Sequence, residues 1–362
     1  MAERPDDRAE LPGGSGPDPI GRRPHEELGV EPESILLADL RRAKGVGHGA
    51  GSELPGAAVE TTVGAVTPGR GLWGNAFRQL LRKKSAVVGM VMLGILLFVA
   101  IFAPLLAPYD PNEVLLGQGV TPREDPCVHL FNWCDDDAPQ HLLGTDGNGR
   151  DELSRVIFGA RVSLLAGVGS VAAAVVMGTI IGLIAGFYGR WVDNVLMRLM
   201  DVLLAFPALL LAIFIVTVFG PGLFNAILAI SVVTVPVYAR VVRSTVLTVR
   251  EADFVKADIA LGVTTPRLIW HRVLPNSLTP LVVQATLGVA TAVLEIAALS
   301  FLGLGVQPPT AEWGSMLAAE RNQVFTAPHL VFFPGLLIMW NVLAFNLLGD
   351  GLRDALDPRL NR

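Results

Sequence analysis

One carboxylate stands alone inside a long apolar segment of this sequence. Glu295 is the single charged residue between positions 273 and 311. A charge in the hydrocarbon core of a membrane is costly and usually functional. Glu295 is therefore a candidate contact for a substrate amine or a partner subunit, and a protonated or hydrogen-bonded packing residue is the alternative. Asp201, at the end of another apolar run, is expected to pair with Arg198 or Arg240.

Other groups that could do chemistry are incomplete. No lysine follows a glycine, so the chain lacks the Gly-Lys-Ser/Thr loop that binds nucleotide phosphates. His25-Glu26 has no second histidine at the helical spacing of a zinc protease. The acids at 135–137, near His141, are consecutive and cannot all face one ion. We therefore expect no catalytic residue, no metal site and no cofactor bound by this chain.

The two cysteines, Cys127 and Cys134, lie seven residues apart in one polar segment. They could close a small disulfide loop if that segment faces an oxidising compartment. Two free thiols are the alternative.

Composition sets the class of protein. The 362 residues are 51% hydrophobic and only 17% charged, with a mean hydropathy of +0.51. A soluble domain carries about 25% charged residues. The net charge of −5 also argues against a nucleic-acid partner, which calls for a basic face. The sequence predicts an all-α integral membrane protein.

The apolar runs predict six transmembrane helices. Each is long enough to cross a hydrocarbon core of about 30 Å. The run from 202 to 239 is too long for one helix, and Gly220-Pro221-Gly222 divides it. The predicted spans are 85–107, 162–188, 200–219, 223–241, 278–304 and 329–349. Within the second span, Gly178, Gly182 and Gly186 predict close approach of another helix.

The first part of the chain differs from the transmembrane domain, which we assign to 85–362. Residues 1–70 are rich in Gly, Pro and charged residues and predict a disordered tail. The tail lacks the apolar core of a cleaved signal, so the first span is expected to act as an uncleaved anchor. Residues 71–84 predict an amphipathic helix at the membrane surface. Its apolar residues fall at helical spacing among four cations: Trp73, Phe77, Leu80 and Leu81 among Arg78, Arg82, Lys83 and Lys84.

Lysine and arginine placement predicts the orientation. With the N-terminus inside, fifteen of these cations lie on the inner side and five on the outer side. Cytoplasmic loops carry such an excess. Both termini and a loop at 244–277 are therefore expected in the cytoplasm, and a loop at 108–160 outside. The five outer cations are Arg123, Arg150, Arg155, Arg161 and Arg321.

The inner loop at 244–277 has its own helical signals. Residues 250–261 favour a helix, and Gly262 is well placed just past its end. Thr265 as N-cap and Pro266 at the first helical position predict a second, short helix that ends at Leu274-Pro275. A rigid loop of mixed polarity suits docking onto another protein, and a simple connector between two spans is the alternative.

This loop resembles the "EAA loop" of bacterial ABC importer permeases. That pattern is Glu-Ala-Ala, three residues and Gly, then an apolar-Leu-Pro ending. Here Lys256, Ala257 and Asp258 stand at the first three positions, so Lys256 replaces the usual Glu and Asp258 the usual Ala. Further similar segments are spread over the chain after residue 72, namely 143–151, 154–155, 159–164, 200–207, 299–309 and 343–359. They point to the second permease subunit of the dipeptide/oligopeptide/nickel group.

The resemblance implies a type I ABC importer permease fold in a bacterial cytoplasmic membrane. It implies as partners a homologous permease, two ATPase subunits that bind ATP and Mg²⁺, and an external solute-binding protein. Gly262 would supply the turn, Leu261, Val263 and Leu268 the apolar contacts, and Lys256 and Asp258 the polar contacts at the rim of the docking loop. Pro275 would pass motion into the fifth span.

The substrate implied is a dipeptide or oligopeptide, with nickel or another small solute as the alternative. A proton-coupled secondary transporter would use Glu295 as proton carrier. Six spans without a visible inverted repeat argue against it. An intramembrane enzyme would need paired catalytic groups at one depth, and Glu295 is alone.

Overall fold

The computed structural model describes residues 72–117, 119–127 and 140–356. These residues form helices and loops, with two isolated bridges and no β-strand. Five helical segments are long and apolar enough to cross a membrane: α3 (Lys84–Ile101), α5 (Glu152–Tyr188), Thr265–Phe301, α8 (Leu223–Arg250) and α13 (His329–Leu356). A bent pair of helices makes a sixth span if it is counted as one. The predicted all-α membrane fold is confirmed, and the tail at 1–70 lies outside the described residues.

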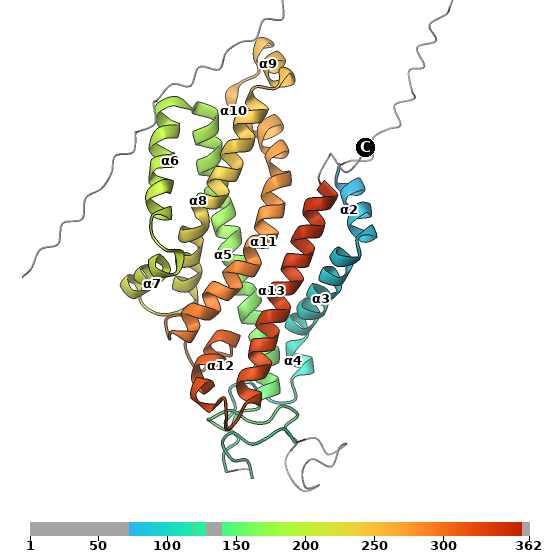
Figure 1. Ribbon diagram of the computed structural model, residues 1–362, viewed down its shortest axis with the longest axis vertical. Coiled ribbons are helices and arrows are strands. Elements are labelled where there is room, and N and C mark those ends of the chain that lie inside the picture. The colour runs from blue at the N-terminus through green and yellow to red at the C-terminus, as the bar shows by residue number, and fades with distance from the viewer. Residues whose placement is uncertain (1–71, 118, 128–139, 357–362) are drawn as a thin grey trace, which may run out of the picture. The chain divides into compact units, whose positions relative to one another are not determined.

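The transmembrane helices run side by side (Figure 1). α5 packs most extensively on α8, and α13 packs on both α3 and the helix that ends at Phe301. The three predicted glycines explain the first contact. A Cβ at Gly182 would lie 2.5 Å from the carbonyl oxygen of Ala239, and one at Gly178 would lie 2.6 Å from the Cβ of Tyr238. The predicted close helix approach is therefore confirmed, and α8 is the helix involved.

Helix α5 begins ten residues before the predicted second span. Asp151 is its N-cap, and its carboxylate accepts a hydrogen bond of 2.8 Å from the amide of Ser154. An Asp at this position satisfies amides that the helix itself leaves unpaired. The helix therefore extends into the segment that hydropathy alone assigns to the loop at 108–160.

The third predicted span, 200–219, is not one helix. It consists of α6 (Arg190–Leu204) and α7 (Ala208–Phe219), and the two axes differ by 91°. Pro207 lies at the break as the N-cap of α7. A proline has no amide hydrogen to donate and disfavours helical geometry in the residue before it, so the helix ends at this point.

Pro275 does not end a helix, contrary to the prediction. α10 (Thr265–Leu268), the π-turn η2 (Ile269–Val273) and α11 (Leu274–Phe301) form one continuous helical segment of 37 residues. In the π-turn, the amide of Leu274 donates to the carbonyl of Ile269, five residues back. This wider turn accommodates Pro275 because it shifts the hydrogen-bond pattern where the proline lacks a donor.

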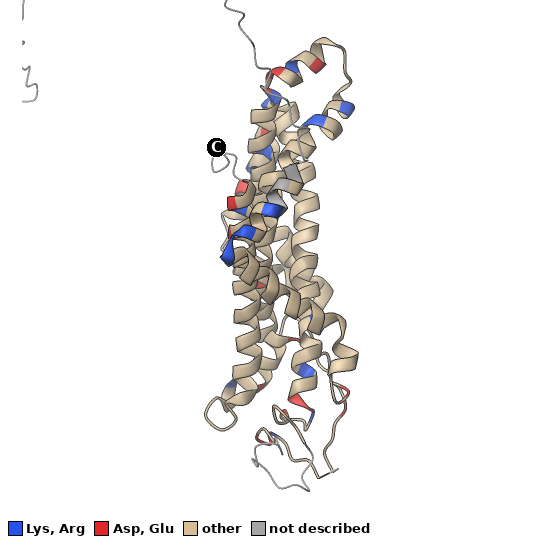
Figure 2. Cartoon of the chain, turned by 90° about the vertical axis from the view of Figure 1, so that its right-hand side faces the viewer, with Lys and Arg blue, Asp and Glu red and all other residues tan. Residues whose placement is uncertain are grey.

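Four further short elements flank or connect the membrane segments. α12 (Trp313–Glu320) and η3 (Arg321–Gln323) connect α11 to α13. α4 (Ala103–Leu106) follows α3, and α2 (Leu72–Arg82) precedes it within the predicted amphipathic segment 71–84. Charged residues gather toward the two ends of the helices, and the band between them is nearly free of charge (Figure 2).

Candidate functional site

The loop between α8 and the fifth membrane segment folds as a helix, a glycine turn and a second helix. α9 (Asp253–Ala260) is followed by Gly262, whose φ of +80° is the left-handed conformation that favours glycine. The Gly262 amide donates to the Ile259 carbonyl, and the Val263 amide to the Asp258 carbonyl, each at 3.0 Å. These bonds satisfy the last carbonyls of α9. The predicted helix and glycine turn are thus both present.

The start of the second helix differs by one residue from the prediction. Thr264, not Thr265, occupies the N-cap position, and Pro266 lies in the first turn of α10. The Thr264 side chain makes no capping hydrogen bond. Pro266 still fits, since a first-turn amide has no partner within the helix.

The loop presents a large apolar surface. We call the exposed side chains Phe254, Ile259, Leu261 and Trp270 the apolar tip; their exposed fractions are 47%, 53%, 82% and 65%. A group of exposed large apolar side chains marks a contact with another protein, a membrane or a ligand. Leu261 was predicted for this role from the sequence. Phe254, Ile259 and Trp270 were not, although their apolar character within a charged loop is a signal that could have found them.

Leu268 was also predicted as an apolar contact, and its placement is different. Its side chain is 1% exposed, so it faces the inside of the loop rather than a partner. Val255 and Val273 are fully buried on the same loop. Val273 belongs to the main apolar core of the transmembrane helices, so the base of the loop is packed onto that core.

The polar residues predicted at the rim are engaged within the chain. Asp258 forms an ion pair of 2.7 Å with Arg272 and thereby ties α9 to the π-turn. Lys256 lies 3.4 Å from Glu251 and is more than half exposed. Ala257, Gly262 and Pro275 are exposed, and Val263 is partly exposed. The structure thus places Lys256 to Val263 around one turn, whereas Pro275 lies farther along the continuous helical segment.

Asp201 pairs with Arg240 at 2.6 Å, as predicted, and both side chains are about half exposed. A second pair, Asp193 with Arg243, has a 2.6 Å bond between Oδ2 and a guanidinium nitrogen. The two pairs join α6 to α8. Asp201 therefore helps to attach α6, the first half of the bent pair of helices, to α8.

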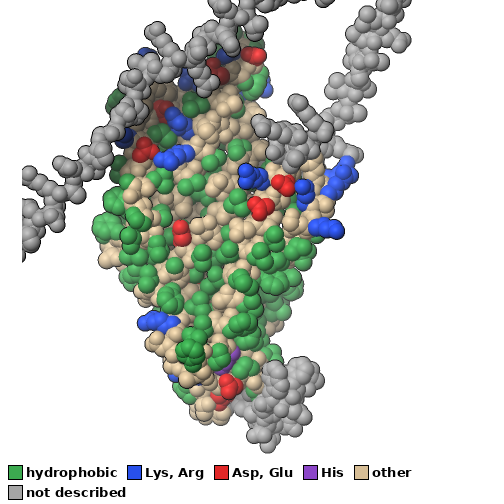
Figure 3. All heavy atoms as spheres, viewed as in Figure 1, with side chains coloured by type: hydrophobic (Ala, Val, Ile, Leu, Met, Phe, Trp, Pro, Cys, Tyr) green, Lys and Arg blue, Asp and Glu red, His purple; other side chains and the backbone are tan. Residues whose placement is uncertain are grey.

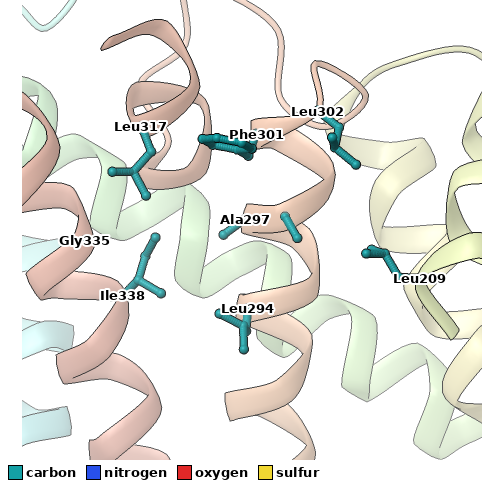
Figure 4. A pocket seen from close by; sticks show the side chains of 9 residues that line it. Leu209, Leu294, Ala297, Phe301, Leu302, Leu317, Gly335 and Ile338 are labelled. Atoms are coloured by element: carbon teal, nitrogen blue, oxygen red, sulfur yellow. The ribbon is translucent and has the colours of Figure 1, made fainter. Parts of the chain in front are cut away.

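Glu295 lies partly buried in α11, and its Oε2 has no hydrogen-bond partner among the described residues. It does not line the apolar groove of about 530 Å³ beside this helix. Figure 4 shows α11 side chains in the middle of that groove, with Leu209 of α7 on one side and Ile338 of α13 on the other. The lining is almost wholly apolar, so the groove can accept apolar groups but offers nothing to a peptide backbone.

The end of the helix bundle that lies opposite the loop with the apolar tip carries buried charged side chains. We call this set the polar cap: His141, Asp146, Arg150, Asp151, Arg155, Glu312 and Glu320. Asp146 is its centre. One carboxylate oxygen accepts from the amides of Asn148 and Arg150, and the other accepts from the Arg150 guanidinium at 2.7 Å and lies 3.4 Å from Arg155.

The polar cap joins α12 to the loop before α5. Glu320 accepts 2.8 Å and 2.9 Å bonds from Arg123 and from the Gly147 amide. Glu312 accepts from the amides of Gly314 and Ser315. Burial is the dominant influence on Glu312 and raises the pKa of its carboxyl, although these two amides oppose the rise. The cap was not predicted. Its pair of Arg123 with Glu320 joins distant residues, but Asp146 and Arg150 are only four residues apart and could have been found from the sequence.

Cys127 is buried and disulfide-bonded, and the described residues contain no free cysteine. Cys134 and the acids at 135–137 lie outside the described residues. The pairing of Cys127 with Cys134 stays a prediction. No group of three His, Cys, Asp or Glu residues in the described chain is arranged to hold a metal ion.

The fold defines a class: a polytopic membrane protein with a structured helical loop between two of its membrane segments. Comparison with known proteins names the family. Residues 178–362 match the binding-protein-dependent transport system inner membrane component, and residues 71–122 match the N-terminal TM domain of oligopeptide transport permease C. This chain belongs to the family of binding-protein-dependent transport system inner membrane components.

Curated relatives match over most of their length. The dipeptide transport system permease protein DppC of Alkalihalophilus pseudofirmus is 47% identical over 82% of this chain and 91% of its own. The di/tripeptide transport system permease protein DppC of Pseudomonas aeruginosa is 47% identical over 78% and 91%. The glutathione transport system permease protein GsiD of Pectobacterium atrosepticum is 39% identical over 80% and 91%. The chain is thus an ABC importer permease of a bacterial inner membrane, as the sequence predicted.

A solved structure of the MetNI methionine ABC transporter is also similar. It is 20% identical with a TM-score of 0.46, and the match covers 56% of this chain and 97% of that chain.

Proposed function

We propose that this chain forms, with a second homologous permease, the pathway through which dipeptides and short oligopeptides enter the cell. The support is the 44–47% identity to several permeases named for dipeptides, over 91–92% of their lengths. Peptide choice in this proposal rests mainly with an external solute-binding protein. Relatives named for glutathione, itself a short peptide, fit the same substrate class.

The apolar tip is the observation that supports a partner protein at this loop. Four large apolar side chains are held on a loop whose interior residues are buried, so the exposed surface is preformed. We assign this surface to one of two ATPase subunits, which would bind ATP and Mg²⁺ while this chain binds no cofactor. A preformed apolar patch costs little ordering when a partner binds it.

The proposed orientation places the docking loop and both termini in the cytoplasm and the polar cap outside. The excess of Lys and Arg on the loop side supports it. Three of the five predicted outer arginines, Arg123, Arg150 and Arg155, pair with carboxylates of this chain. The positive charge at the cap end is therefore largely compensated within the fold.

The continuous helix supplies a route for coupling. The segment Thr265–Phe301 runs from the docking loop to the apolar groove, a length of about 55 Å at 1.5 Å per residue. A displacement of the tip by the ATPase would move this helix as one body and alter the groove end. Such a rigid-body change can switch a pathway between two states.

The first test is ATP hydrolysis by the purified complex in lipid, with and without binding protein and a mixed peptide library. Stimulation by peptide supports the importer and its substrate class. Stimulation only by nickel or another solute keeps the architecture and replaces the substrate. Transport driven by a proton gradient, with no ATPase subunit in the complex, would contradict the proposal.

Gly262 variants test the docking loop itself. Gly262→Asp is expected to leave membrane insertion intact and to abolish peptide-stimulated ATP hydrolysis. A Cβ at Gly262 meets no described atom within 4 Å, so any clash arises with the partner or from the backbone. Gly262→Asn, which tolerates the left-handed conformation, and Gly262→Val, which does not, separate these causes. Normal transport by Gly262→Asp would refute the docking role.

A further inference from the structure

The helix before the first membrane span carries cations that no described carboxylate neutralises. α2 ends at Arg82, and α3 begins at Lys84, the first residue of an apolar span. Among the described residues, Arg78, Arg82 and Lys84 are exposed and form no ion pair. In contrast, Arg240 and Arg243 on α8 each have an aspartate partner. The unpaired cations are available to an external anion.

Packing fixes the direction in which these cations point. Leu80 is buried with Ala86 and Ala355, so this side of α2 faces the end of α13. A Cβ at Gly351 of α13 would lie 2.3 Å from the Cβ of Ala86 on α3 and 3.3 Å from the Cδ1 of Leu80 on α2, so the end of α13 approaches both helices closely. Lys83 adds an ion pair of 3.1 Å with Asp354. α2 is therefore anchored to α13.

The cationic face lies away from that anchor. Arg78 and Arg82 are one helical turn apart and so share a face, while Leu80 lies about 160° to 200° around the helix from them. Leu81, beside Arg82, is 51% exposed. Exposed cations and an exposed leucine together at the start of a membrane span suit the boundary between headgroups and acyl chains.

The local charge favours an anion. Lys and Arg side chains gather where α2 meets the end of α13 (Figure 3). Arg353 joins the four cations of residues 78–84, and the described carboxylates nearby on the last turns of α13 are Asp350 and Asp354. Five cations against two carboxylates leave an excess of three positive charges. Basic segments at a membrane surface attract anionic lipids.

We propose that Arg78, Arg82 and Lys84 form a binding site for the phosphate headgroups of anionic phospholipids, with Leu81 in contact with the acyl region. Its occupant would fix α2, α3 and the end of α13 to the bilayer. Lys83 takes no direct part because Asp354 holds it.

The test uses the full-length chain purified with its partner subunits in neutral detergent. Phosphatidylglycerol and phosphatidylcholine are titrated in turn, and bound lipid is counted by native mass spectrometry at low salt. Wild type is expected to prefer phosphatidylglycerol. Arg78→Ala with Arg82→Ala is expected to weaken its binding by about fivefold per cation, roughly 25-fold in all. Arg78→Lys with Arg82→Lys, which keeps the charge, is expected to retain most of the binding.

Two further variants serve as controls for the charge and the place of the proposed lipid site. Arg161→Ala with Arg321→Ala removes the same charge near the polar cap and is expected to leave phosphatidylglycerol binding unchanged. Asp354→Asn frees Lys83 and is expected to strengthen it by about fivefold. Unchanged binding in the alanine pair on α2, or an equal loss in the control pair, would overturn the site. Displacement of lipid by millimolar inorganic phosphate would show a free-phosphate site instead and would also overturn it.

Discussion

The polar cap and the apolar tip lie at opposite ends of the same helices and are built in opposite ways (Figure 1). In the cap, charged side chains are buried and paired within the chain, as Asp146 is with Arg150. In the tip, apolar side chains such as Leu261 are exposed. A buried polar group without a partner is costly, whereas an exposed apolar group is stabilised only when another surface covers it.

The comparison separates stability from assembly. The charged groups of the polar cap are paired within the chain. The cap should therefore hold α12 and the loop that precedes α5 in place without a partner protein. The apolar side chains of the tip are exposed in the isolated chain. Their burial should depend on contact with a second protein. Variants in the cap should therefore change unfolding, and variants of the tip should change binding while the chain stays folded.

The largest expected effect follows from removal of the carboxylate at the centre of the cap. Asp146→Ala leaves Arg150 and Arg155 without their shared partner in a buried site. Breaking a buried pair in this way costs about 3–5 kcal/mol. The free energy of unfolding in detergent should fall by that amount. A fall below 1 kcal/mol would show that the cap is not a rigid unit.

Next is the interior of the docking loop. Leu268→Ala removes a buried side chain and should destabilise the loop by about 2–5 kcal/mol, read as faster amide exchange in α9 and α10. Leu261→Ala, of the same chemistry but 82% exposed, is the control and should leave exchange unchanged. Equal exchange in the two variants would contradict the division of the loop into core and surface.

A smaller effect is expected at the exposed Leu261, and it should appear in partner binding rather than in stability. Leu261→Asp places a carboxylate on the apolar tip and should weaken the association with the ATPase subunit by about 2 kcal/mol, or roughly 30-fold. The melting temperature of the isolated chain should not change. Co-purification of ATPase at the wild-type ratio, at limiting concentration, would remove the tip from the interface.

The smallest expected effect is a pH dependence in the cap. Burial raises the pKa of Glu312 in the folded chain. The stabilisation from this group is therefore complete below its unfolded pKa and is lost as pH rises through the folded value. Between pH 4 and pH 7, the stability of wild type should decline relative to Glu312→Gln, which does not titrate. A difference between the two that stays constant with pH would contradict the raised pKa.

The sequence predicted the features that depend on local patterns. Apolar runs placed the membrane segments, and Gly262 after a helical segment placed the turn of the docking loop. An arginine partner for Asp201 was also predicted, because a charge at the end of an apolar run needs a partner, and Arg240 is the one of the two predicted candidates that forms the pair. The predictions about proline were less successful. Pro275 was expected to end a helix, and a π-turn accommodates it. Pro207 interrupts the predicted span 200–219, although residues 202–219 carry no charge.

The amino-acid sequence by itself determined the membrane class, the number of apolar segments and the place of the docking turn. Hydropathy and glycine conformation act over a few neighbouring residues, so a linear pattern records them. Tertiary structure alone decided that Leu268 is buried while Leu261 is exposed, and that Glu320 meets Arg123. Both outcomes depend on which distant segments pack together, since burial and ion pairing are properties of contacts in space rather than of residue type.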